Sequence, residues 1–116
     1  MRPGQRDAAH DITPADAARL VDAGEAVLLD VREDDEWAAG HATAATHVPL
    51  GRLRADSVPA GSTVVAVCRS GARSDQAAVA LRGTGFDARN LTGGMNAWKQ
   101  AGLPVLRDDG RPGEVI

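Results

Sequence analysis

One stretch near the middle of the chain constrains the fold most, because it is predicted to run from a strand through a loop into a helix. Residues 64–67 are small and apolar and include three valines, which is typical of a buried strand. The only cysteine, Cys68, follows directly. After a short polar loop, residues 74–82 favour a helix, with Ser74 or Asp75 placed to cap or charge its first turn. Cys68 is therefore expected one loop ahead of a helix N-terminus.

This position suits Cys68 to nucleophilic chemistry. The unpaired N–H groups and the dipole at a helix N-terminus favour a negative charge such as a thiolate. Nearby cations, which Arg69 and Arg73 supply, also lower the pKa of a cysteine. The alternative is that Cys68 is a small buried hydrophobe, as free cysteines often are. The two arginines, with Ser70 and Gly71 between them, favour a nucleophilic cysteine in an anion-holding loop.

Elsewhere the chain alternates short strands with helices. The predicted strands are residues 10–12, 26–31, 48–50, 64–67 and 86–91, and the predicted helices are residues 14–23, 33–39, 74–82 and 95–101. We therefore expect an α/β fold, a small open parallel sheet of about five strands flanked by helices on both faces. The expected organisation is a flexible leader over residues 1–9, a single domain over 10–106 and a polar C-terminal tail over 107–116.

Composition narrows the classes of function. A chain of 116 residues, 43% of them hydrophobic, can bury a core as one domain. Its net charge of −3 and its scattered arginines argue against nucleic-acid binding, which calls for a basic stripe. The cysteine and the histidines lack metal-site spacing, and no apolar run is long enough to cross a membrane. We expect a cytoplasmic protein without metal or cofactor that binds a small anion.

Five sequence motifs occur in the order in which one known family has them. They are Leu29-Asp30-Val31-Arg32 with Glu36-Trp37; Gly40-His41; Val48-Pro49-Leu50; Cys68-Arg69-Ser70-Gly71-Ala72-Arg73-Ser74; and Leu91-Thr92-Gly93-Gly94-Met95 through Ala97-Trp98 to Gly102-Leu103-Pro104. On these motifs the chain resembles a single-domain rhodanese. The resemblance implies a thiosulfate sulfurtransferase. In such an enzyme the cysteine thiolate takes the outer sulfur of an anionic donor, forms a persulfide, and passes the sulfur to a thiophilic acceptor such as cyanide.

The loop chemistry and the resemblance together assign roles to individual residues. Cys68 is the predicted catalytic nucleophile. The loop after it can curl so that successive N–H groups point at one centre, and the predicted donor-binding residues are Arg69, Ser70, Gly71, Ala72, Arg73 and Ser74. Arg69 is expected to contact the donor, whereas Arg73 either binds the donor or braces the loop, and Ser74 is expected to cap the helix.

Three charged residues are expected to support the loop. Asp30 and Arg32 come at the end of a predicted strand, the edge at which open α/β sheets generally place their ligand sites. We expect Asp30 to accept hydrogen bonds from N–H groups of the Cys68 loop. Arg32 is expected to pair with Glu36 in the following helix. The alternative for Asp30 and Arg32 is a purely structural ion-pair network.

Two other functions fit parts of this pattern. Cysteine phosphatases and arsenate reductases also hold an oxyanion in a cysteine loop ahead of a helix. Their cysteine and arginine are separated by one residue more than the four between Cys68 and Arg73, and the shorter loop better suits a single sulfur atom. The other alternative is a rhodanese-like module that regulates a partner or relays sulfur to another protein. The intact loop disfavours a purely regulatory module and leaves a protein thiol open as the acceptor.

Overall fold

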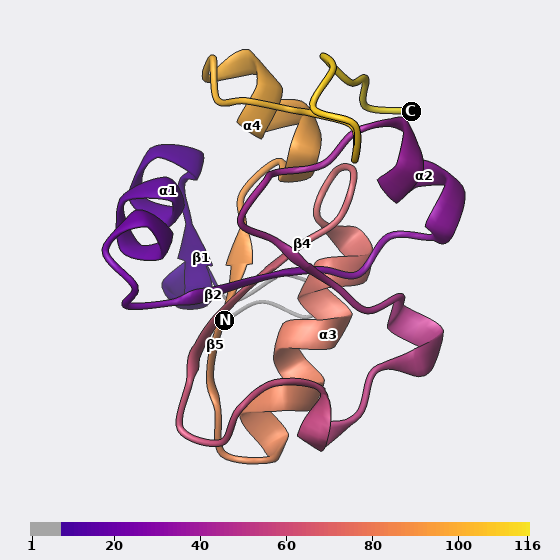
Figure 1. The fold of residues 1–116 in the computed structure, drawn as a ribbon. Coiled ribbons are helices and arrows are strands. Elements are labelled where there is room, and N and C mark those ends of the chain that lie inside the picture. The colour runs from indigo at the N-terminus through magenta and orange to yellow at the C-terminus, as the bar shows by residue number, and fades with distance from the viewer. Residues whose placement is uncertain (1–7) are drawn as a thin grey trace.

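The computed structural model describes residues 8–116, so residues 1–7 of the predicted leader lie outside it. Its centre is one parallel sheet of five strands, as predicted, in the order β1-β5-β4-β2-β3 (Figure 1). The strands are β1 (Asp11–Ile12), β2 (Val27–Asp30), β3 (Thr46–His47), β4 (Thr63–Val67) and β5 (Asp87–Leu91). The predicted edge strand near the N-terminus is confirmed, whereas the short third strand lies ahead of the expected residues 48–50.

The helices follow the predicted order, and their bounds differ from the predicted ones by one or two residues. They are α1 (Pro14–Asp22), α2 (Asp34–Ala39), α3 (Ala72–Gly83) and α4 (Gly94–Gln100), with 3-10 turns at Ala8–His10, Leu50–Arg52 and Ala55–Ser57. Helix α3 begins two residues before the predicted start at Ser74. The reason is that Gly71 occupies the N-cap position with a φ of +120°, a conformation that favours glycine. Among residues 8–116 no helix has the length and apolar character needed to cross a membrane.

Side chains alternate across β4 and build two separate cores. Val65 and Val67 pack into one apolar cluster with residues of α1 and α4, such as Met95. Val64 and Ala66 point to the opposite face and pack against α3. Figure 1 shows α1 and α4 on one side of the sheet and α3 on the other. The predicted arrangement, with helices on both faces of the sheet, is confirmed.

The strand order creates a switch point between β2 and β4. These two strands are neighbours, but the chain continues from β2 to β3 on one side and from β4 to β5 on the other. In open parallel sheets, ligands bind outside the carboxyl ends of the strands at such a point. Asp30 ends β2, and Cys68 directly follows β4. The sheet therefore places Asp30 and Cys68 at the same edge, where a ligand site is expected.

The C-terminal residues lie beside α2 (Figure 1). The Glu114 N–H donates to the carbonyl of Ala39 at 2.9 Å, and Leu106 forms isolated bridges with His41 and Pro112. A Cβ atom added at Gly40 would lie 2.7 Å from the Glu114 nitrogen, so the two backbones are in close contact. The predicted polar tail is thus hydrogen-bonded to the end of α2.

Candidate active site

Cys68 lies in a short loop whose donors point at its sulfur. The Gly71 N–H donates to Sγ at 3.1 Å, and the Ser74 hydroxyl lies 3.3 Å from Sγ. Gly71 can turn its amide inward because of its positive φ, which a residue with a side chain would adopt only with strain. The loop therefore forms the predicted concave set of donors around Cys68.

These donors decide the ionisation of the thiol. Burial raises the pKa of Cys68, because the charged form loses its hydration. Hydrogen bonds lower that pKa by more, so it lies below its ordinary value. The largest lowering comes from the Ser74 hydroxyl, followed by the backbone N–H groups of Ser74, Gly71 and Ser70. The thiolate is thus stabilised chiefly by amides and a hydroxyl, whereas the attraction between Cys68 and Arg73 contributes less.

The surroundings of Cys68 combine features of a buried hydrophobe with hydrogen bonds to its sulfur. Its residue exposure is 1%, and it packs in the apolar cluster with Ala66 and Ala77, as a buried hydrophobe would. Its sulfur nevertheless accepts hydrogen bonds, which a purely structural cysteine does not need. Arg69 and Ser70, the next residues along the chain, are exposed, so the loop that encloses the sulfur is itself open to solvent.

Helix α4 fixes the orientation of the loop backbone. The Met95 N–H donates to the carbonyl of Cys68 at 2.8 Å, and the Asn96 N–H donates to the carbonyl of Arg69 at 3.1 Å. In a trans peptide the N–H of the next residue points away from the carbonyl. Turning the Arg69 carbonyl toward α4 therefore turns the Ser70 N–H the other way, and this N–H is one of the donors that lower the Cys68 pKa.

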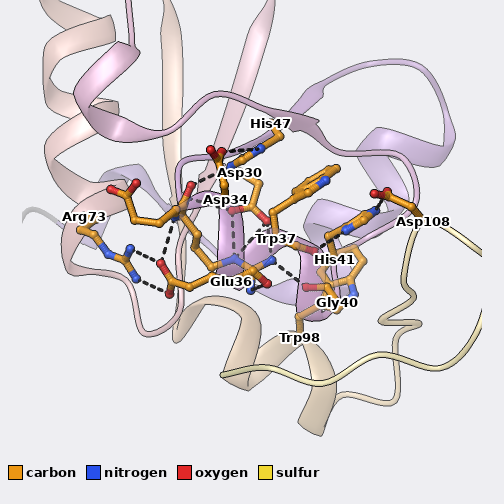
Figure 2. Close-up of polar contacts among 12 residues, drawn as sticks. Asp30, Asp34, Glu36, Trp37, Gly40, His41, His47, Arg73, Trp98 and Asp108 are labelled. Carbon is orange, nitrogen blue, oxygen red and sulfur yellow. Dashed lines mark hydrogen bonds and ion pairs between the residues drawn. The ribbon is translucent and has the colours of Figure 1, made fainter.

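Glu36 and Arg73 join α2 to the first turn of α3. The Arg73 guanidinium contacts the Glu36 carboxylate in a bidentate geometry, with Nη1–Oε1 at 2.6 Å and Nη2–Oε2 at 2.8 Å (Figure 2). This contact lowers the pKa of Glu36 to about 2 and raises the pKa of Arg73. Of the two roles expected for Arg73, this geometry is that of a brace for the loop.

The hydrogen-bond partners predicted for Asp30 and Arg32 are wrong. Asp30 accepts from Arg32, with Nη2–Oδ2 at 2.7 Å, and both side chains are fully buried. Arg32 was expected to pair with the Glu36 carboxylate, but it donates to the backbone carbonyls of Glu36 and Gly40. The guanidinium thus fills the space between the end of β2 and the last turn of α2, where helix carbonyls attract a cation. Asp30 stabilises this buried cation, and the loop amides turn to the sulfur instead.

Trp37 of α2 stacks on two histidines from the residues that follow the helix. The Trp37 ring is stacked between His41 and His47, with ring centroids 3.6 Å and 4.7 Å away (Figure 2). His47 Nε2 lies 2.7 Å from the carbonyl of Arg32, and His41 Nδ1 lies 2.7 Å from the carbonyl of Trp37. These contacts hold α2 at the sheet edge, so they also position the Glu36 carboxylate.

Ser74 does not cap α3, contrary to the sequence prediction. It is fully buried in the first turn, and its hydroxyl lies 3.3 Å from Cys68 Sγ and 2.5 Å from Oδ1 of Asn90. Asn90, on β5, is a site residue that the sequence analysis missed. The signal for it is a polar residue just before the carboxyl end of a predicted buried strand, but nothing local pairs Asn90 with a residue 16 positions away.

Comparison with known proteins gives a consistent result. A family model for the Rhodanese-like domain matches residues 13–101. A sulfurtransferase of Allochromatium vinosum is 38% identical over 95 residues, which cover 79% of this chain and 89% of that protein. The uncharacterized protein slr1261 of Synechocystis is 38% identical over 108 residues, covering 90% of this chain. The chain spans only 60% of the length of slr1261.

The fold has solved counterparts as well. The crystal structure of a rhodanese-related protein from Thermoplasma volcanium superposes with a TM-score of 0.76 at 25% identity. The match covers 84% of this chain and 97% of the other. Sequence and structure comparisons therefore agree on the same kind of domain.

Proposed function

The chain belongs to the rhodanese-like sulfurtransferase family, and from this premise we propose that it transfers a sulfane sulfur through a persulfide on Cys68. The proposed donor is a small anion, thiosulfate, and the proposed acceptor is cyanide or a thiol. The observation that carries the proposal is the set of N–H and O–H donors aimed at a single buried sulfur. The fold holds these donors within hydrogen-bond distance of the sulfur before the reaction begins, where they stabilise negative charge on it.

The first half-reaction loads the sulfur. The Cys68 thiolate forms a bond to the outer sulfur of thiosulfate, the S–S bond of thiosulfate breaks, and its electron pair leaves with sulfite. A thiolate and a thiosulfate dianion become a persulfide anion and a sulfite dianion, so the charge balances and no proton is transferred. A lowered pKa of Cys68 keeps the attacking thiolate populated near neutral pH.

The second half-reaction returns Cys68 to its starting state. Cyanide attacks the outer sulfur of the persulfide, the S–S bond breaks, and the electron pair stays on Cys68 as a thiolate while thiocyanate leaves. A thiolate of a partner protein can take the place of cyanide, in which case the persulfide moves to that partner. We propose a reducing compartment, the cytoplasm, because the reaction needs Cys68 unoxidised.

Arg69 is the proposed contact to the anionic donor. It directly follows Cys68 and is exposed, and within residues 8–116 its guanidinium forms no ion pair. Cys68 is 1% exposed, so we propose that the donor reaches the sulfur when the exposed side chains of Arg69 and Ser70 move aside. Arg73 is held by Glu36, which supports a bracing role and leaves Arg69 as the cation that can turn to the donor.

The test is the mass of the protein after incubation with thiosulfate and removal of excess reagent. The wild type is expected to gain the mass of one sulfur atom, to lose it on adding cyanide, and to release thiocyanate. Cys68→Ala is the matched variant and should gain nothing. An equal gain by Cys68→Ala would overturn the site, and robust hydrolysis of p-nitrophenyl phosphate by the wild type would favour the oxyanion alternative.

A further inference from the structure

The Ser74 hydroxyl faces more acceptors than it can serve. Its oxygen lies 2.5 Å from Asn90 Oδ1, 3.3 Å from Cys68 Sγ and 3.3 Å from the carbonyl of Gly71. A hydroxyl carries one hydrogen, so it donates to only one of these groups at a time. All of them are buried, so no bulk water is at hand to satisfy the others.

The amide orientation of Asn90 is fixed by its neighbours. Its Nδ2 donates to the carbonyl of Gly71 at 3.1 Å, and a carbonyl can only accept. Oδ1 must therefore face Ser74 as an acceptor. The Gly71 carbonyl also accepts from the Asp75 N–H at 3.1 Å, so it stays hydrogen-bonded even without Asn90.

We propose that Asn90 is a positioning residue, whose Oδ1 holds the Ser74 hydroxyl hydrogen while Cys68 Sγ is uncharged and releases it to Sγ when the sulfur is a thiolate. In the thiol form the S–H can donate to Ser74 Oγ while Ser74 donates to Asn90, so every group is satisfied. In the thiolate form Ser74 turns to the sulfur, and Asn90 Oδ1 is left without that donor. An unsatisfied buried acceptor costs free energy, so Asn90 opposes ionisation of Cys68.

The part that this hydrogen plays during sulfur transfer rests on the proposed function. In the persulfide the negative charge lies on the outer sulfur, so Sγ no longer needs the Ser74 hydrogen and Asn90 takes it back. When the acceptor removes the outer sulfur, the charge returns to Sγ and the hydrogen follows it. Asn90 also limits how far the thiol pKa falls, which preserves nucleophilicity, because nucleophilicity declines with the pKa of a thiolate.

The test is a pH titration of the thiolate by its ultraviolet absorbance. The chain has one cysteine and no tyrosine, so the absorbance change reports Cys68 directly. Asn90→Leu is expected to lower the pKa of Cys68 by about one unit, because Ser74 then donates to the thiolate without a competing amide. Gln100→Leu, at an exposed amide residue at the end of α4, is the control and should leave the pKa unchanged.

Measuring the effect of Asn90→Leu in the Ser74→Ala variant separates a positioning role of Asn90 from a merely structural one. In Ser74→Ala the hydroxyl is gone, so adding Asn90→Leu should shift the pKa by less than about a third of its effect in the wild type. An unchanged or raised pKa in Asn90→Leu, or an equal shift in both backgrounds, would overturn the inference. If Asn90→Leu does not fold, Asn90→Ala carries the same expectation. The titration needs no sulfur donor, so its outcome is independent of whether thiosulfate is the substrate.

Discussion

Cys68 combines two environments that act on its thiol in opposite directions. Burial in an apolar cluster disfavours the thiolate, whereas donors from the loop and from Ser74 favour it. A hydrogen bond to a charged group contributes about 1.5–3 kcal/mol, so a few such donors outweigh the loss of hydration. The same burial strengthens each of these hydrogen bonds, because little water competes for the sulfur.

Glu36 provides a pH-dependent contribution to stability. Its contact with Arg73 lowers the pKa of Glu36 from an ordinary 4.5 to about 2, so its stabilising effect is complete above the ordinary value and is lost as the pH falls toward 2. The Glu36 side chain is 14% exposed and that of Arg73 is 33% exposed, so solvent weakens the pair. We expect Glu36→Gln to lower the free energy of unfolding at neutral pH by about 1–2 kcal/mol.

The measurement is urea unfolding of both proteins from neutral pH down to about pH 2. The difference between wild type and Glu36→Gln should shrink across this range, while other carboxylates affect both proteins alike and cancel. Glu25→Gln, at an exposed position, is the control and should match the wild type throughout. A difference that stays constant with pH would mean that the pair does not act through the Glu36 charge.

Among the elements, α4 has a role that its length does not reveal. Its first N–H groups bind the carbonyls of Cys68 and Arg69, so the helix turns the neighbouring loop amides toward the sulfur. This contact requires a close backbone approach. A Cβ atom added at Gly94 would lie 2.5 Å from both of those carbonyl oxygens, and the φ of Gly94 is +63°. No residue larger than glycine fits there without moving the helix or the loop.

Comparing Gly94→Ala with Gly102→Ala separates the steric clash of an added Cβ atom from the strain of a positive φ. Both positions have a positive φ, but a Cβ at Gly102 meets nothing within 4 Å. Gly102→Ala should cost only the left-handed penalty, roughly 1–2 kcal/mol. Gly94→Ala should cost at least about 3 kcal/mol and slow persulfide formation, because the loop amides lose their orientation. Urea unfolding and the thiosulfate assay measure the two effects, and equal losses in both variants would argue against contact between α4 and the loop.

For the molecule as a whole, the sequence was sufficient to predict the sheet, apart from the position of its short third strand. Apolar runs and the turn residues between them predicted a five-stranded parallel α/β fold, because strand periodicity and helix caps are local signals. Thr13 illustrates such a local signal, since its side chain caps α1 by accepting from the Asp16 N–H. The position of Cys68 at the carboxyl edge of the sheet follows from the same local signals.

The side-chain contacts within the site could not be predicted from local signals. Arg73 and Glu36 are 37 positions apart, and their contact depends on how α2 docks beside α3. Arg32 was assigned to Glu36 because the two are close in sequence, but the Asp30 carboxylate lies closer to it in the folded protein. Side-chain pairs between elements are set by tertiary packing, which a local pattern does not contain.

Sulfur transfer on Cys68 requires that the folded chain stabilise a thiolate there. Titration of the thiolate absorbance in the folded protein and in the urea-unfolded protein measures this stabilisation. We expect a lower pKa of Cys68 in the folded protein, because only there do the loop amides and the Ser74 hydroxyl converge on the sulfur. A folded pKa equal to or above the unfolded one would show that burial outweighs the donors and that the fold does not stabilise the thiolate.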